Sequence, residues 1–189
     1  MESIGLFYMN SITEHKPKKI LNLGCGSDMY GTDRVDLFKT PATTLVLNID
    51  KENLPYKDNT FDEILASGVI EHLKNIGHFE EEVFRVLKKN GTLKILTDSA
   101  TYIFWHTRKK WEHNNYLKHY YNIDNFKHNQ GEDSHLHLFV ESHLRSLFRR
   151  FSKIEINYIA HGRNAILRFV ANSLPFNFGK RQIILTAIK

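Results

Sequence analysis

Cysteine and long apolar runs are almost absent from this 189-residue sequence. Cys25 is the single cysteine, so the chain can form neither an internal disulfide nor a cysteine-based zinc site. Apolar runs such as residues 68–70 are far shorter than the roughly 20 residues that span a bilayer. The first 16 residues lack the basic-then-apolar layout of a secretory signal. These absences predict a cytoplasmic protein with no membrane partner.

The rest of the composition is that of an ordinary globular domain, except for the distribution of charge. Hydrophobic residues make up 41% of the chain and charged residues 25%, which is typical of one domain with its own core. Residues 1–100 hold 12 lysines and arginines against 15 acids, whereas residues 101–189 hold 14 against 6. A basic half is typical of proteins with an acidic substrate, nucleic acid or a membrane surface as partner, and equally of a solvated surface with no partner.

Two kinds of segment alternate along the first half of the chain. Short apolar runs typical of buried strands lie at residues 19–23, 44–49, 61–66 and 92–97. Between the last two runs, apolar residues recur with helical spacing over residues 77–89, and Asn90-Gly91 follows as a helix stop. Strands that alternate with helices predict an α/β fold: a Rossmann-like, doubly wound and mostly parallel sheet with helices on both faces.

The second half predicts the end of the same domain together with two insertions. An amphipathic helix and two strands are predicted, at residues 141–151, 153–160 and 181–188. The last strand is expected to be antiparallel, and a further helix is expected around 165–172. We predict one domain over residues 1–189, in which 101–140 form a cap that contacts the substrate and 161–180 form a second insertion.

The first strand ends in a glycine turn, Gly24-Cys25-Gly26, that lets a ligand approach the backbone closely. The turn differs from the dinucleotide fingerprint, because Met29 stands where the third glycine would be. No Gly-Lys-Ser/Thr of a phosphate-binding loop follows either. Asp36 and Asp50 come at the ends of the next two strands, where a carboxylate accepts hydrogen bonds from ribose hydroxyls or an adenine amino group. The pattern predicts a pocket for a nucleoside without a phosphate.

The motifs resemble, in order, those of class I S-adenosylmethionine-dependent methyltransferases of the small, stand-alone type. LNLGCGS at 21–27 is similar to the first motif of this family, and residues 48–73 are similar to the block around its third and fourth strands. Residues 79–96 are similar to its helix, turn and fifth strand, and residues 135–151 resemble a late segment more loosely. The resemblance implies S-adenosylmethionine as the cofactor and methyl transfer as the activity.

The resemblance also implies which residues bind the cofactor. They lie at the strand ends of the first half: Asn22, Gly24, Cys25, Gly26, Asp36, Leu37, Asp50, Lys51, Ser67 and Gly68. Among them, the 24–26 turn would contact the methionine part, Asp36 the ribose, Asp50 the adenine amino group and residues 67–68 the sulfonium. Asn22 stands where the family often has an acid, and Asp28 stands where it has a third glycine.

Candidate catalytic residues lie near the end of the fifth strand and before the amphipathic helix. Asp98 follows the strand, and His135 and His137 alternate with leucines, so both imidazoles point the same way in an extended segment. A histidine there takes a proton from a hydroxyl or carboxylic acceptor at neutral pH. The pair also fits a structural role, or metal binding with a third residue such as His143; we predict no metal centre. Glu71-His72 is interpreted as the structural start of a helix.

The sequence leaves the methyl acceptor open. Residues 66–69 read Ala-Ser-Gly-Val, not the Asn/Asp-Pro-Pro-aromatic run typical of enzymes that methylate base amines. We therefore expect transfer to oxygen or nitrogen of a small-molecule or glycan-type acceptor, which the basic half allows to be anionic. The aromatic, basic second half favours an RNA-directed enzyme as the alternative. Asn22 and Asp28 favour a non-catalytic protein that only binds the cofactor.

Overall fold

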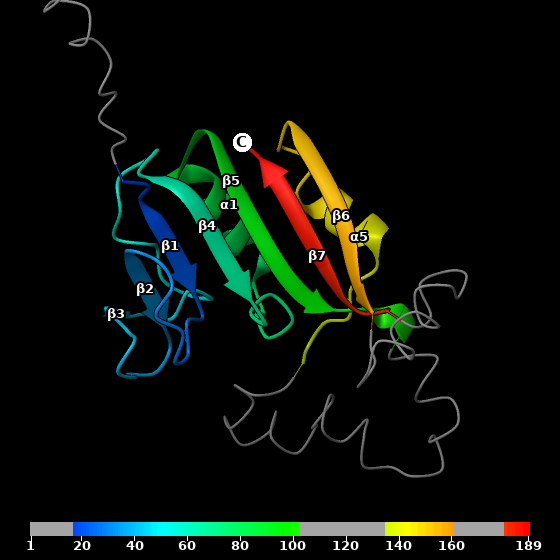
Figure 1. The fold of residues 1–189 in the computed structure, drawn as a ribbon, viewed down its shortest axis with the longest axis horizontal. Helices are drawn as coiled ribbons and strands as arrows, with labels where there is room; N and C mark the ends of the chain where they lie inside the picture. Colours follow the sequence, from blue (N-terminus) through cyan, green and yellow to red (C-terminus); the bar gives the residue numbers. More distant parts are fainter. Residues whose placement is uncertain (1–16, 103–134, 161–179) are drawn as a thin grey trace, which may run out of the picture.

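The computed structural model describes residues 17–102, 135–160 and 180–189, which form one seven-stranded sheet (Figure 1). The strands are β1 (Ile20–Leu23), β2 (Asp33–Asp36), β3 (Leu45–Val46), β4 (Phe61–Ser67), β5 (Leu87–Asp98), β6 (Lys153–Ala160) and β7 (Lys180–Ile188). Their order across the sheet is β3-β2-β1-β4-β5-β7-β6. The first five strands are parallel to one another, and β7 runs antiparallel to both β5 and β6. The predicted Rossmann-like sheet with an antiparallel last strand is confirmed.

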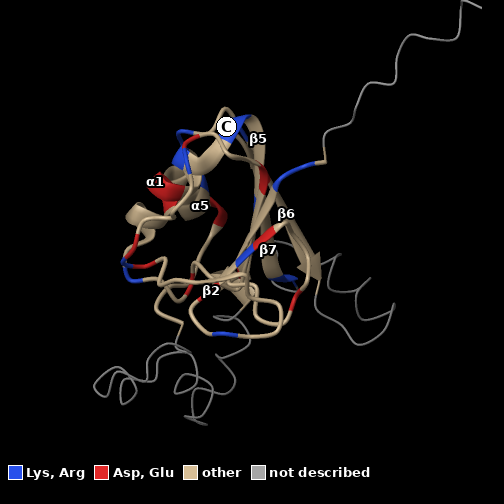
Figure 2. Cartoon of the chain, turned by 90° about the vertical axis from the view of Figure 1, so that its left-hand side faces the viewer, with Lys and Arg blue, Asp and Glu red and all other residues tan. Residues whose placement is uncertain are grey.

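The two described helices, α1 (Ile76–Val86) and α5 (Glu141–Leu147), lie on the same face of the sheet (Figures 1 and 2). Neither of them is long and apolar enough to cross a membrane. The connections before and after β2 are loops. Neither of the two described helices covers the other face, so the helices expected there are not seen in residues 17–102, 135–160 and 180–189.

The core lies between the sheet and these two helices. One row of apolar side chains crosses five strands: Leu23, Ala66, Ile95, Leu185 and Ile156. Phe79 and Val83 of α1 and Leu144 of α5 belong to the same cluster and are fully buried. Each large apolar side chain that is buried in this way contributes about 1.5–3 kcal/mol to folding. The core fixes the strand register and therefore the positions of the strand ends.

Helix α1 ends three residues earlier than the sequence predicts. The predicted stop at residues 90–91 is wrong, because the chain is already in β5 from Leu87 onwards. The backbone amides of Asn59 and Thr60 donate to the last carbonyl oxygens of α1 at 3.0 and 2.7 Å, and Lys189 Nζ donates to Leu87 O at 2.7 Å. Contacts from segments far away in sequence, not the local stop signal, end this helix.

Strand β3 is also shorter than the predicted run at 44–49. A turn begins at Asn48, whose backbone oxygen accepts hydrogen bonds from the amides of Lys51 and Glu52 at 3.0 and 2.8 Å. The Asn48 side chain accepts a further hydrogen bond from the Asp50 amide at 3.0 Å. Side-chain bonding of this kind stabilises a turn at the expense of a strand. Residues 47–51 therefore leave the strand and form a turn at the end of β3.

The other predicted elements of the described part agree closely with the structure. Strands 61–66 and 153–160 correspond to β4 and β6, while the helix predicted at 141–151 ends at Leu147 and continues in turns. Most of the predicted cap, from residue 103 to residue 134, lies outside the described residues. So do the helix predicted around 165–172 and its insertion up to residue 179.

Candidate active site

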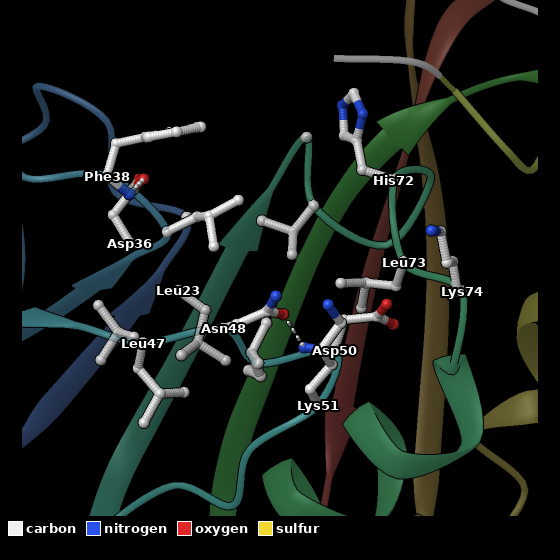
Figure 3. A pocket seen from close by; sticks show the side chains of 16 residues that line it. Leu23, Asp36, Phe38, Leu47, Asn48, Asp50, Lys51, His72, Leu73 and Lys74 are labelled. Atoms are coloured by element: carbon white, nitrogen blue, oxygen red, sulfur yellow. Dashed lines mark hydrogen bonds between the residues drawn. The ribbon is translucent and has the colours of Figure 1, made fainter. Parts of the chain in front are cut away.

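A cavity of about 410 Å³ opens where the parallel strands end (Figure 3). The residues that line it lie at the ends of β1, β2, β3 and β4 and in the segments that follow these strands: 23–24, 35–38, 47–51, 68–69 and 72–74. Six of the predicted cofactor residues line it: Gly24, Asp36, Leu37, Asp50, Lys51 and Gly68. The other four are not among the lining residues: Asn22, Cys25, Gly26 and Ser67. In an open parallel sheet, this edge is where ligands bind.

Gly24 brings the backbone of the first turn directly against the far wall of the cavity. Its φ is +64°, and a Cβ at this position would lie 2.4 Å from Val69 Cγ2. The amides of Gly24 and Cys25 both donate to Val35 O, at 2.8 and 3.2 Å, which ties the turn to β2. No side chain fits at Gly24 unless Val69 moves. The glycine is therefore required by sterics as well as by its backbone conformation.

Asp36 ends β2 with a carboxylate that the backbone already orients. Asp36 Oδ2 accepts a hydrogen bond from the Gly26 amide at 2.7 Å, and Oδ1 accepts one from the Phe38 amide at 2.9 Å. A carboxylate offers about four acceptor sites, so two remain for a ligand. This arrangement suits the recognition of a pair of hydroxyl groups.

Asp50 lies on the opposite wall and is held in a similar way (Figure 3). Asp50 Oδ1 accepts a hydrogen bond from the Asn75 amide at 2.7 Å, just before α1 begins. Its Oδ2 has no hydrogen-bond partner among the described residues. Each of the two acids thus presents acceptor capacity to the cavity while its other contacts fix its orientation.

Asn22 and Cys25 have structural contacts away from the cavity. Asn22 is 2% exposed, and its Nδ2 donates to Asp28 Oδ2 at 3.3 Å and to Tyr30 O at 3.2 Å. Asn22 and Asp28, the two departures from the family pattern, therefore bind each other and hold the loop between β1 and β2. Cys25 is 4% exposed, with its Sγ 3.8 Å from Thr43 Oγ1.

Some of the lining residues were not selected from the sequence: Leu23, Val35, Phe38, Leu47, Asn48, Ile49, Val69, His72, Leu73 and Lys74. Residues 69–74 belong to the same motif block as Gly68, so their proximity was available as a signal. Phe38 follows Asp36 and is 56% exposed, which is unusual for a large apolar side chain. In the wall after β3, residues 47–49 were not selected, because the sequence predicts a strand there.

Asp98 and His135, two of the predicted catalytic residues, lie together beside the cavity. Asp98 ends β5, and its Oδ2 lies 3.9 Å from His135 Nδ1, while its Oδ1 lies 3.8 Å from Arg181 Nε. The His135 ring packs edge-on against His72, which lines the cavity, with ring centroids 4.7 Å apart. The structure therefore joins residues from three distant segments into one polar group.

His137 has a different environment from His135, although the two alternate in sequence. A nitrogen of its ring, Nε2, lies 2.9 Å from Leu73 O. The amides of Leu136 and His137 also donate to Glu71 O, at 2.7 and 3.1 Å. His137 therefore anchors the segment that carries His135 onto the turn after β4.

Glu71 is a buried carboxyl group beneath this contact. It lies in a turn five residues before α1 begins, so the interpretation of Glu71-His72 as the start of a helix is wrong. The Thr97 hydroxyl donates to Glu71 Oε2 at 3.0 Å. Burial nevertheless raises the pKa of Glu71 to about 7, and the neighbouring Asp98 carboxylate acts in the same direction.

Comparison with known families identifies the segment that forms most of the cavity. Residues 31–95 match a family model described as a methyltransferase domain. The match begins after the glycine turn and contains both lining acids and the whole turn after β4. No curated protein matches the chain.

Solved structures with the same fold are S-adenosylmethionine-dependent methyltransferases. One from Archaeoglobus fulgidus superposes with a TM-score of 0.62 at 13% identity, over 92% of this chain and 87% of that one. One from Thermotoga maritima gives 0.61 at 16% identity, over 92% and 83%. Phosphoethanolamine N-methyltransferase 2 of Haemonchus contortus, in complex with S-adenosyl-L-methionine, gives 0.55 at 15% identity over 93% of this chain and 50% of that one.

Proposed function

We propose that the chain acts as a class I S-adenosylmethionine-dependent methyltransferase, which the matched family model and the shared fold support. In this proposal it transfers the methyl group to oxygen or nitrogen of a small, polar acceptor of the small-molecule or glycan type. Bound S-adenosylmethionine supplies a methyl group that is already activated on a sulfonium. The protein therefore has to hold the donor, orient the acceptor and exclude water.

The six predicted cofactor residues that line the cavity form the donor site in this proposal, with the rest of the glycine turn beside them. Asp36 accepts hydrogen bonds from the ribose hydroxyls, and Asp50 Oδ2 accepts one from the adenine amino group. The closely packed turn at Gly24, with Cys25 and Gly26, contacts the methionine part through its backbone. Gly68 has no side chain, so it leaves open the space between the cavity and Glu71. A Cβ at Gly68 would lie 3.9 Å from Glu71 Oε1.

The single observation that carries the acceptor proposal is the polar group beside the cavity. Asp98 lies 3.9 Å from His135 Nδ1 and 3.8 Å from Arg181 Nε, so a carboxylate, an imidazole and a guanidinium meet at one place beside the cavity. Arg181 is basic and its side chain is 46% exposed, so an acidic acceptor would be attracted to this side. In the proposal, Asp98 and His135 act on the acceptor, and His137 positions the segment that carries His135.

RNA is the less favoured acceptor, because one arginine of the basic second half already has a partner. Arg150 Nη1 lies 3.2 Å from Glu80 Oε2, and its guanidinium lies 4.1 Å from the Phe84 ring centroid. This side chain covers helix α1 and is not presented as a phosphate contact.

A labelled-methyl assay tests the proposal. The full chain is incubated with S-adenosylmethionine that carries a tritiated methyl group, together with a cell extract separated into small-molecule, glycan, RNA and protein fractions. We expect label in the small-molecule or glycan fraction, and loss of that label with Asp50→Ala but not with Glu81→Gln, an exposed acid on α1. Label confined to RNA would refute the acceptor proposal. Cofactor binding without label in any fraction would leave a non-catalytic binding protein.

A further inference from the structure

Glu71, His72 and His135 bring three potential metal ligands into one cluster beside the cavity. Each offers one ligand atom, and these atoms lie within 4.8 Å of one another. The two imidazole rings meet edge to face at an interplanar angle of 87°. His143, which the sequence suggested as a third ligand to His135 and His137, is exposed on α5 and is not part of this cluster. The grouping follows from the fold, since His135 is more than 60 residues from the other two.

The backbone holds the two halves of this cluster together. Glu71 O accepts hydrogen bonds from two consecutive amides of the segment that begins at His135, and the His137 ring lies 2.9 Å from Leu73 O. The two residues that accept these contacts, Glu71 and Leu73, flank His72 in the sequence. The relative placement of the two histidines is thus set by main-chain bonding and does not depend on the ligand atoms themselves.

Glu71 is the group for which a cation would make the largest energetic difference. It is 3% exposed, and the Thr97 hydroxyl that contacts Oε2 leaves Oε1 on the side of Gly68. Ionising a buried carboxyl group is costly unless a positive charge lies beside it. Two of its side-chain neighbours, the Thr97 hydroxyl and the Asp98 carboxylate, carry no positive charge. A divalent cation would supply the missing charge.

Asp98 gives His135 the kind of support that metal-binding histidines have. Its carboxylate lies 3.9 Å from His135 Nδ1 and is itself 7% exposed. A carboxylate that accepts a hydrogen bond from one ring nitrogen orients the other nitrogen for a metal and raises its basicity, and a small movement of either side chain would have to shorten the 3.9 Å separation for this bond to form. Asp98 would therefore act behind the ligands without binding the ion.

We propose that Glu71, His72 and His135 bind one divalent transition-metal ion, with Zn²⁺ as the best match. Two imidazoles and one carboxylate are a ligand set of catalytic zinc sites, in which a further position stays open. Ligands at about 2.1 Å in tetrahedral geometry lie about 3.4 Å apart, so the three side chains close in slightly on the ion. The cluster adjoins the cavity, because His72 is one of the lining residues, and the set of three ligands leaves one position for a further ligand. An acceptor oxygen bound there would lose its proton more readily, a consequence that rests on the proposed function, whereas metal binding does not.

The test is calorimetric titration of the full, metal-stripped chain with Zn²⁺, followed by measurement of the metal content after dialysis. We expect one tightly held ion per chain, and at least a 100-fold weaker affinity with His135→Ala, because loss of a supporting outer group alone costs about 10- to 100-fold. His143→Ala is the matched control and should bind like the parent, which separates the cluster from adventitious binding to a chain with 11 histidines.

The outcomes separate this inference from the proposed function. If the parent takes up no Zn²⁺, or if His135→Ala and His143→Ala bind it equally, the inference is overturned while S-adenosylmethionine binding is unaffected. If the metal binds as expected but no acceptor is methylated, the inference stands and the proposed function fails. Circular dichroism and S-adenosylmethionine titration show that His135→Ala is folded; should it not be, His72→Ala provides the same comparison.

Discussion

Replacing Gly24 by alanine tests the idea that sterics at the glycine turn shape the cavity. A non-glycine residue at φ +64° costs about 1–2 kcal/mol. The new methyl group would also lie 2.4 Å from Val69 Cγ2, far inside van der Waals contact, and overpacking of this kind costs about 1–3 kcal/mol. We therefore expect Gly24→Ala to lower the free energy of unfolding by about 2–5 kcal/mol.

Two further variants separate the two costs. Gly26 has φ +52° but open space where a Cβ would lie, so Gly26→Ala should lose only about 1–2 kcal/mol. In the double variant Gly24→Ala/Val69→Ala the clashing methyl is gone, and the two substitutions should couple favourably by at least about 1 kcal/mol. Equilibrium urea unfolding of the parent, Gly24→Ala, Val69→Ala, the double variant and Gly26→Ala measures the five free energies that this comparison needs. Equal losses for Gly24→Ala and Gly26→Ala, or strictly additive effects in the double variant, would refute the steric argument.

Three other predictions concern contacts that hold α1 in place. Arg150→Ala should destabilise the fold by about 1–3 kcal/mol, because it leaves the buried Glu80 carboxylate without its ion pair; urea unfolding checks this, and no loss would contradict it. Lys189→Met should lower the free energy of unfolding by about 1 kcal/mol, because Leu87 O, just after α1, loses its donor. Thermal unfolding checks this, and an unchanged midpoint would show that the helix ends there for another reason. The Arg85 guanidinium lowers the pKa of Glu82 in the folded protein. The stability that this pair contributes should therefore be present above the ordinary carboxyl pKa and be lost as the pH falls through the lowered pKa. Glu82→Gln should flatten the stability–pH curve in this acidic range.

The sequence was sufficient to predict most strands of the sheet because they are short apolar runs, whereas β2, with the sequence Asp-Arg-Val-Asp, is not such a run and its bounds were not predicted. Residues 153–160 were predicted as a strand with the bounds that β6 has in the structure. The end of α1 was mispredicted because Asn90-Gly91 looks like a local stop, whereas the amides of Asn59 and Thr60 end the helix from another segment. Local patterns carry no information about such partners.

The candidate site likewise has a part that could be predicted from the sequence and a part that could not. Gly24, Asp36 and Asp50 could be selected from the sequence, because strand ends of a parallel sheet meet at one edge whatever the loops between them do. The cluster of Glu71 with His135 could not, because it depends on where the segment from residue 135 docks after a long connection. His135 and His137 look equivalent in sequence, yet one lies beside a carboxylate and the other lies against a backbone carbonyl.

The central claim is that the cavity between Asp36 and Asp50 holds S-adenosylmethionine, and calorimetric titration of the full chain with this molecule tests it most directly. The parent should bind one molecule per chain. Asp50→Asn keeps an oxygen for the Asn75 amide but presents a donor to the adenine amino group; loss of a hydrogen bond to a charged group, worth about 1.5–3 kcal/mol, should weaken binding about 10- to 150-fold. Glu81→Gln should bind like the parent. No binding by the parent, or equal affinity in Asp50→Asn and Glu81→Gln, would contradict the account.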